Sequence, residues 1–136
     1  MMKLRYIQRG IWSILAICDD RGGCCLVQEF IDRLGTNSQS DYDQVMAQLR
    51  WTAVNGPPRN DKKSRPLADK IFEFKTRGGI RIPYFYDKDR LIICTDAIRK
   101  PKKTELRAVI ARALATRERY FEAKRRGAVE MIQEES

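Results

Sequence analysis

The sequence predicts a small α+β sandwich, and three observations favour this fold class. Helical and strand-like hydrophobic patterns fall in separate blocks along the chain. Glycine, proline and polar residues mark the boundaries between these blocks. The blocks follow the order strand, two helices, three-strand meander and helix. This order favours an antiparallel sheet, made of the N-terminal strand and the meander, with the helices packed on one side.

The N-terminal half is expected to hold one strand and two helices. Residues 12–18 are almost continuously apolar, which is typical of a buried strand. Apolar residues recur at helical spacing over residues 26–34, and this spacing predicts the first helix. A second helix is expected from Ser38 or Ser40, either of which can cap it, to the stop signal at residues 55–58.

The C-terminal half is expected to form the meander and the last helix. Residues 69–77 alternate between polar and aromatic side chains, and Gly78-Gly79 signals a hairpin turn. Residues 80–86 form the second predicted strand of the meander. Residues 91–95 are apolar on both faces, so this third strand is expected at the centre of the sheet. A long helix with an apolar stripe from Leu106 onward follows.

Length and composition bound the architecture. Residues 1–136 are expected to form a single domain, with a frayed tail over 128–136. Composition predicts a turn at 19–23 and a polar surface loop at 59–64. No stretch is apolar for long enough to span a membrane, and the first residues lack a cleavable signal pattern. We therefore expect a cytoplasmic protein that makes no membrane contact.

The cysteine spacing argues against a metal site. The four cysteines are Cys18, Cys24, Cys25 and Cys94, no two of them have C-x-x-C spacing, and the chain contains no histidine. We expect the cysteines to be small buried hydrophobic residues in a reducing compartment. The sequence therefore predicts no metal and no cofactor.

Positive charge is concentrated in one segment. Residues 99–126 hold eleven Lys or Arg and three Glu, so this segment carries +8 of the net charge of +9. The predicted strands before it also carry outward Lys and Arg side chains. A concentration of this kind indicates a polyanionic partner, and RNA is the expected one.

Several local strings occur in an order that belongs to a known family. Val27–Leu34 is similar to the helical pattern V-x-E-F-L-x-x-L, and Val54–Pro57 resembles the link x-N-G-P. Ile71–Lys75 and Gly79–Tyr84 resemble two strands of the same pattern. Ala97–Thr104 is similar to F-x-K-K-x-x-K-T-P. Together these strings resemble the RelE/ParE toxin superfamily, specifically its HigB-like branch.

The sequence departs from that family pattern at four positions. Ile80 and Ala97 stand where aromatic residues are usual, and Arg99 and Glu105 stand where lysine and proline are usual. Loss of two aromatic residues is expected to weaken the stacking of RNA bases.

The resemblance implies a RelE-like sandwich and a role as the toxin of a type II toxin–antitoxin system. It implies an mRNA interferase, which is an endoribonuclease that cuts mRNA on the ribosome. The implied partners are the ribosome, mRNA and a cognate antitoxin of the HigA-like, helix-turn-helix kind.

RNA can be cut without a metal ion. The 2′-oxygen attacks the adjacent phosphorus and the 5′-oxygen leaves, which requires a base, an acid and cations that stabilise the phosphorane. Histidine usually supplies the base and the acid, but this chain has none. Lysine, tyrosine and carboxylates remain for proton transfer, and arginine remains for charge stabilisation.

Six residues are the catalytic candidates. Arg81 is expected to clamp the phosphate, because a guanidinium matches phosphate geometry, and an ion pair with Glu73 is its alternative role. Lys75 is expected to be the base or an electrostatic partner. Tyr84 or Tyr86 is expected to donate a proton or stack on a base, and a place in the core is the alternative for at least one of them. The remaining two, Arg99 and Lys103, are expected to grip the phosphate from the start of the last helix.

A second set of cations is expected to bind RNA without taking part in the cleavage step. Residues 99–104 are expected to form one edge of the cutting site, and residues 107–126 a docking face for ribosomal RNA or for an antitoxin. A solvated surface is the alternative for each of these cations. The RNA-binding candidates are Arg77, Lys100, Lys102, Arg107, Arg112 and Arg119.

Two other functions are compatible with the same sequence. A ParE-like protein would poison DNA gyrase and would need no RNA-cutting residues. A non-enzymatic nucleic-acid-binding relative would bind RNA or DNA in a strongly salt-dependent way, with no toxicity.

Overall fold

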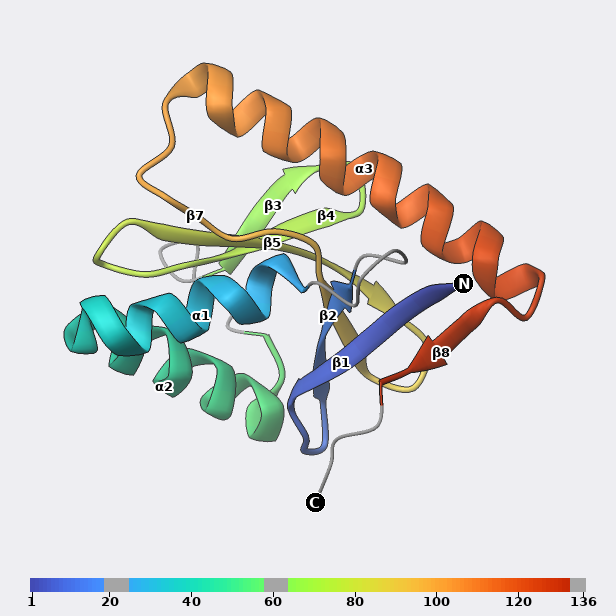
Figure 1. The fold of residues 1–136 in the computed structure, drawn as a ribbon, viewed down its shortest axis with the longest axis horizontal. Helices are drawn as coiled ribbons and strands as arrows, with labels where there is room; N and C mark the ends of the chain where they lie inside the picture. Colours follow the sequence, from blue (N-terminus) through green and yellow to red (C-terminus); the bar gives the residue numbers. More distant parts are fainter. Residues whose placement is uncertain (19–24, 58–63, 133–136) are drawn as a thin grey trace.

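The computed structural model describes residues 1–18, 25–57 and 64–132 (Figure 1). The predicted turn at 19–23 lies outside the described residues, as does the predicted loop except for its last residue. None of the described helices is long and apolar enough to cross a lipid bilayer. In chain order the elements are β1 (Met2–Gln8), β2 (Ser13–Cys18), α1 (Leu26–Asn37), α2 (Gln39–Asn55), β3 (Ser64–Ala68), β4 (Ile71–Lys75), β5 (Ile80–Asp87), β6 (Leu91–Cys94), β7 (Ile98–Arg99), α3 (Lys103–Arg125) and β8 (Val129–Met131).

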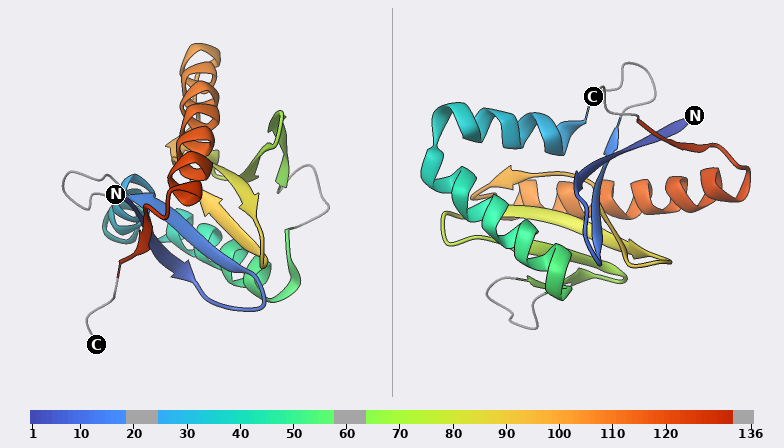
Figure 2. Two further views of the ribbon diagram at one scale, coloured as in Figure 1. Left: turned by 90° about the vertical axis from the view of Figure 1, so that its right-hand side faces the viewer. Right: turned by 90° about the horizontal axis from the view of Figure 1, so that it is seen from below.

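The described residues form three layers. The sheet lies in the middle, α1 and α2 cover one face, and α3 crosses the other (Figure 1, Figure 2). Successive residues of β5 show the division, since Tyr84 belongs to the core beneath α1 and α2 and Phe85 to the core beneath α3. The α+β class is therefore confirmed, but the expectation that all helices lie on one side was wrong. Because β2, β5 and β6 are apolar on both faces, the sheet needs a cover on each side.

The sheet is mixed rather than antiparallel throughout. Its strand order is β3-β4-β5-β6-β2-β1-β8, and β7 pairs with β5. The predicted meander is present as β4, β5 and β6, all antiparallel. However, β2 runs parallel to β6, and β8 runs parallel to β1. The tail that was expected to be frayed therefore supplies an edge strand over Val129–Met131.

Helix α3 packs on the sheet along most of its length. Its buried residues extend from Val109 to Ala123. Near its C-terminal end, the Tyr120 hydroxyl donates a hydrogen bond to the Asp87 carboxylate at 2.5 Å, and Lys124 pairs with the same carboxylate at 2.7 Å. Burial by itself raises the pKa of Asp87, but the hydrogen bonds from Lys124 and Tyr120 outweigh it and lower that pKa. These contacts fix the second half of the helix to the end of β5.

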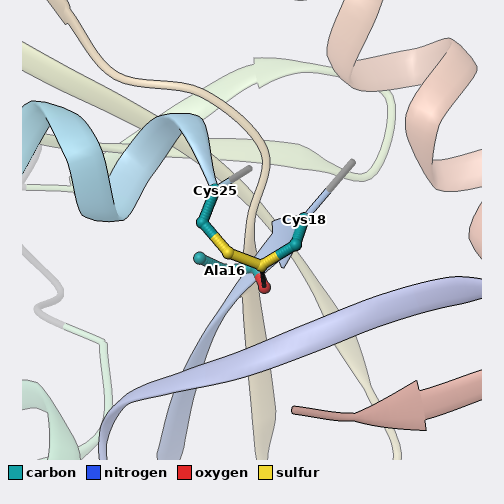
Figure 3. Close-up of a disulfide and its surroundings, with 3 residues drawn as sticks. All are labelled: Ala16, Cys18 and Cys25. Carbon is teal, nitrogen blue, oxygen red and sulfur yellow. Dashed lines mark hydrogen bonds between the residues drawn. A yellow bond between two sulfur atoms is a disulfide. The ribbon is translucent and has the colours of Figure 1, made fainter. Parts of the chain in front are cut away.

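Two of the four cysteines differ from the expectation of free buried thiols, and Cys24 lies outside the described residues. Cys18 at the end of β2 and Cys25 just before α1 form a disulfide, which joins a strand to a helix (Figure 3). Both residues are buried, so the expectation of burial was right for them. Cys94 remains a buried free thiol, and burial raises its pKa to about 12.

Candidate nucleic-acid interface

Positive side chains gather at one end of the sheet, on three segments that the fold brings together. The tip of the β4–β5 hairpin, β7 and the link from β7 into α3 lie at this end (Figure 1). Ile80 pairs with Arg99 across β5 and β7, and the Lys100 amide donates a hydrogen bond to the Gly79 carbonyl at 2.7 Å. We define the basic edge as the six cations on these segments: Lys75, Arg77, Arg99, Lys100, Lys102 and Lys103.

The first turns of α2 hold the basic edge in place. Asp41 is 8% exposed, and its carboxylate accepts a hydrogen bond from the Ser38 hydroxyl at 2.9 Å and pairs with Arg99 at 2.6 Å. The hydrogen bond from Ser38 is the main cause of a lowered pKa at Asp41, and Arg99 adds to it. The Gln44 side chain accepts a hydrogen bond from the Gly78 amide at 3.1 Å. A side chain at Gly78 would collide with the Asp41 carboxylate, which explains the glycine.

Sequence reasoning missed the role of Asp41 and Gln44. Their partners lie in the hairpin and in β7, far away along the chain, so no local spacing marks them. The available signal was the Gly78-Gly79 pair, because two adjacent glycines at a hairpin tip suggest that another element approaches the backbone closely.

Lys75 and Arg81 are cross-strand partners on β4 and β5, on the face of the sheet that α3 covers. Arg81 binds Glu73 there, and its Nε and Nη2 donate to the two carboxylate oxygens at 2.8 and 2.6 Å. The Glu73 side chain is fully buried and the Arg81 side chain is 12% exposed. The alternative role for Arg81 is therefore present in the structure. Nη1 is the guanidinium nitrogen that Glu73 does not engage.

The two candidate tyrosines lie on the opposite face of the sheet. Tyr84 is fully buried and stacks on Phe74, with ring centroids 4.4 Å apart. Tyr86 is half-buried, and the centroid of its ring lies 6.0 Å from that of Trp12. Burial raises the pKa of the Tyr86 hydroxyl. The two hydroxyls lie 3.4 Å apart. The structure therefore does not bring either tyrosine together with Lys75, and the core alternative holds for Tyr84.

Positive side chains continue beyond the basic edge into the first turns of α3. Lys102, Lys103 and Arg107 are exposed, and none of them forms an ion pair with another described residue. The Lys102 amide donates to the Glu105 carboxylate at 3.2 Å, which caps the helix with the residue that replaces the usual proline. The positive end of the helix dipole adds to the charge of these lysines.

Two arginines that were expected to bind RNA have partners within the protein. Arg112 pairs with Asp96 at 2.8 Å, and Arg119 donates to the Thr116 hydroxyl at 3.2 Å. Both arginines remain exposed. The charge available to a partner is therefore denser at the start of α3 than in its middle.

The two positions at which this chain lacks the aromatic residues of the family pattern face the core. Ile80 is fully buried, and Ala97 packs against the same core beneath α1 and α2. The replacement of aromatic residues at these positions therefore changes the packing beneath the basic edge and leaves its cations in place.

The chemistry that this arrangement offers is that of lysine and arginine. Among the described residues, no three His, Cys, Asp or Glu side chains lie close enough to hold a metal ion together. Lys75 is partly exposed next to Arg81, and exposed lysines follow on the link into α3. Such an array can bind phosphates through charge and hydrogen bonds.

Comparison with known proteins identifies the family. The family described as Phage derived protein Gp49-like (DUF891) matches residues 29–118, from α1 through most of α3. This stretch includes every member of the basic edge and both residues of the Arg81–Glu73 pair. No curated protein matches the chain. The chain belongs to the phage-derived Gp49-like family, a family of RelE-like toxins of toxin–antitoxin systems.

Proposed function

We propose that this toxin is a ribosome-dependent mRNA endonuclease of the HigB-like type, which a cognate helix-turn-helix antitoxin neutralises in the cytoplasm. The observation that carries the proposal is the basic edge, where three segments of the chain converge with Lys75 beside Arg81. A backbone of closely spaced phosphates is the ligand that such an edge complements.

The proposed reaction needs no metal ion. The 2′-oxygen of one nucleotide loses its proton and attacks the adjacent phosphorus, and the bond to the 5′-oxygen breaks. The departing 5′-oxygen takes up a proton from water, so a 2′,3′-cyclic phosphate and a 5′-hydroxyl result. Lys75 takes the 2′ proton or stabilises the charge that develops on the phosphate. Lys103 and Arg99 hold the phosphate or its neighbours, and Arg81 acts mainly by fixing the strand pair that carries Lys75.

The decisive experiment is inducible expression of the wild type, Lys75→Ala and Lys103→Ala, with RNA 5′ ends mapped across the transcriptome. We expect the wild type to arrest growth and to produce new 5′ ends within translated reading frames. Loss of a proton-transfer group typically slows a reaction about 100-fold or more, so Lys75→Ala should remove the new ends. Lys88→Ala is the matched control, because Lys88 is an exposed lysine on the turn after β5, outside the basic edge.

Three outcomes would contradict the proposal. Growth arrest with double-strand breaks, an SOS response and intact mRNA indicates gyrase poisoning instead. Salt-sensitive RNA binding without toxicity at any expression level indicates a non-enzymatic binding protein. Cleavage that persists when translation is blocked contradicts the dependence on the ribosome.

A further inference from the structure

A groove of about 660 Å³ lies at the opposite end of α3 from the basic edge. It is formed between the last turns of the helix and the start of β1, and the N-terminus lies near this end of α3 (Figure 1). Its apolar lining comes from both sides, with Phe121 and Ala123 on the helix and Met2 and Ala128 across from them. The Met2 amide donates to the Ala128 carbonyl at 2.9 Å, which joins the start of β1 to the residues that follow α3.

The rim of this groove carries charges of both signs. Arg117, Arg119, Arg125 and Arg126 line it, together with Glu118 and Glu122. Glu122 pairs with both Arg125 and Arg126, and the hydrogen bond from Arg125 is the main cause of a lowered pKa at Glu122. The groove therefore differs from the basic edge, where Lys102 and Lys103 are exposed and form no ion pair with another described residue.

An apolar floor with a mixed but mainly positive rim fits a protein better than RNA. Carboxylates on the rim repel phosphates, whereas they pair with lysines or arginines of a protein partner. Apolar walls bind aliphatic side chains and contribute little to contacts with a phosphate backbone. The charge also disfavours a second copy of this chain, because an isologous contact would place the four arginines against each other.

We propose that this groove is the docking surface for an acidic, amphipathic segment of the antitoxin. Apolar side chains of that segment enter between Phe121 and Met2, and its carboxylates pair with Arg125 and Arg126 on the rim. The Arg125 side chain is 70% exposed and the Arg126 side chain is 69% exposed. Both therefore reach a partner without rearrangement of the helix. This inference rests on the family's association with antitoxins and does not depend on whether the toxin cuts RNA.

The test measures the affinity of the purified toxin for the product of the adjacent reading frame by isothermal titration calorimetry. The groove variant is Arg125→Glu/Arg126→Glu. The matched control is Arg33→Glu/Lys88→Glu, which changes the net charge equally on exposed residues of α1 and of the β5–β6 turn. We expect the groove variant to bind about tenfold or more weakly, and the control to bind within about threefold of the wild type.

Two further measurements keep the result interpretable. Arg125→Ala/Arg126→Ala retains good helix formers at the end of α3, so a loss of affinity in this variant as well is attributed to the missing charges rather than to unfolding. Binding to purified ribosomes is measured for every variant. Equal affinity of the groove variant and the control for the antitoxin overturns the proposal. Loss of ribosome binding by the groove variant alone, with antitoxin binding unchanged, assigns the groove to ribosomal RNA and also overturns it.

Discussion

The guanidinium of Arg81 donates two hydrogen bonds, from Nε and Nη2, to the two carboxylate oxygens of Glu73, and both side chains lie almost entirely out of solvent. An ion pair in such a position depends on both partners. Its Coulomb energy balances the cost of removing two charges from water, and loss of one partner leaves the other charge buried. Arg81 was expected to clamp a phosphate, but its replacement also breaks this ion pair. Its variants must therefore be compared for stability as well as for activity.

Arg81→Ala is expected to destabilise the fold. Removal of the arginine takes two hydrogen bonds and one positive charge away from the buried Glu73 carboxylate, and loss of one partner of a buried ion pair costs about 3–5 kcal/mol of the free energy of unfolding. Urea denaturation followed by circular dichroism measures this loss. The paired replacement Glu73→Leu/Arg81→Met should return to within about 2 kcal/mol of the wild type, since both charges of this pair are removed together. A loss below about 1 kcal/mol in Arg81→Ala would show that the pair does not contribute in this way.

Tyr86→Phe is expected to leave RNA cleavage unchanged, whereas Lys75→Ala removes it. The two side chains project from opposite faces of the sheet, and the Tyr86 hydroxyl lies next to that of Tyr84 rather than next to the basic edge. Cleavage rates on programmed ribosomes, compared at equal folded concentration, measure the difference. A tenfold drop in Tyr86→Phe with unchanged stability would mean that the tyrosine reaches the RNA from the other face.

The meander and the helices could be predicted because their signals are local. Alternating aromatic residues in Ile71–Lys75 and the Gly78-Gly79 turn specify a hairpin by themselves. By contrast, β1 is interrupted by polar residues and depends on its pairing with β2 and β8. The three residues of β8 form a strand only because β1 offers them an edge. Non-local pairing of this kind leaves no periodic pattern in the sequence.

The candidate site could be predicted in part, for a related reason. Charge density located Lys100, Lys102 and Lys103, whereas Tyr84, which was grouped with Arg81 as a catalytic candidate, lies on the opposite face of the sheet. The sequence did not indicate which cations are engaged within the protein. Asp41 reaches Arg99 only because α2 packs against the hairpin tip, and this is a property of the tertiary structure.

Asp87→Asn is expected to loosen the second half of α3 at neutral pH. The mutation weakens the two hydrogen bonds that the Asp87 carboxylate accepts from Tyr120 and Lys124, both of which are charge-assisted, at a cost of about 1–3 kcal/mol. The folded-state pKa of Asp87 lies below its ordinary value. The carboxylate therefore makes its full contribution to the free energy of unfolding above about pH 4–5. This contribution is lost as the pH falls through the folded-state pKa.

The free energy of unfolding of wild type and Asp87→Asn, measured from pH 7 to pH 2, tests this assignment. The difference should be constant down to about pH 5 and should then shrink. Tyr120→Phe is the companion variant, since it removes one of the two hydrogen bonds and leaves the ion pair with Lys124. A difference that grows in acid would contradict the lowered pKa of the Asp87 carboxyl.

The Cys18–Cys25 disulfide is expected to stabilise the junction between β2 and α1 under oxidising conditions. It closes a short loop, with seven residues of sequence separation, so its entropic effect lies near the lower end of the usual range, about 2 kcal/mol.

Peptide mapping without reductant should recover these two cysteines as one linked fragment, and Cys18→Ser should lower the melting temperature only when reductant is absent. Cys94 serves as the internal reference, because a fully buried thiol whose pKa is raised to about 12 resists alkylation until the protein unfolds. Recovery of Cys25 linked to Cys24 or to Cys94 would contradict the pairing, and equal melting temperatures of the oxidised and reduced wild type would contradict its contribution to stability.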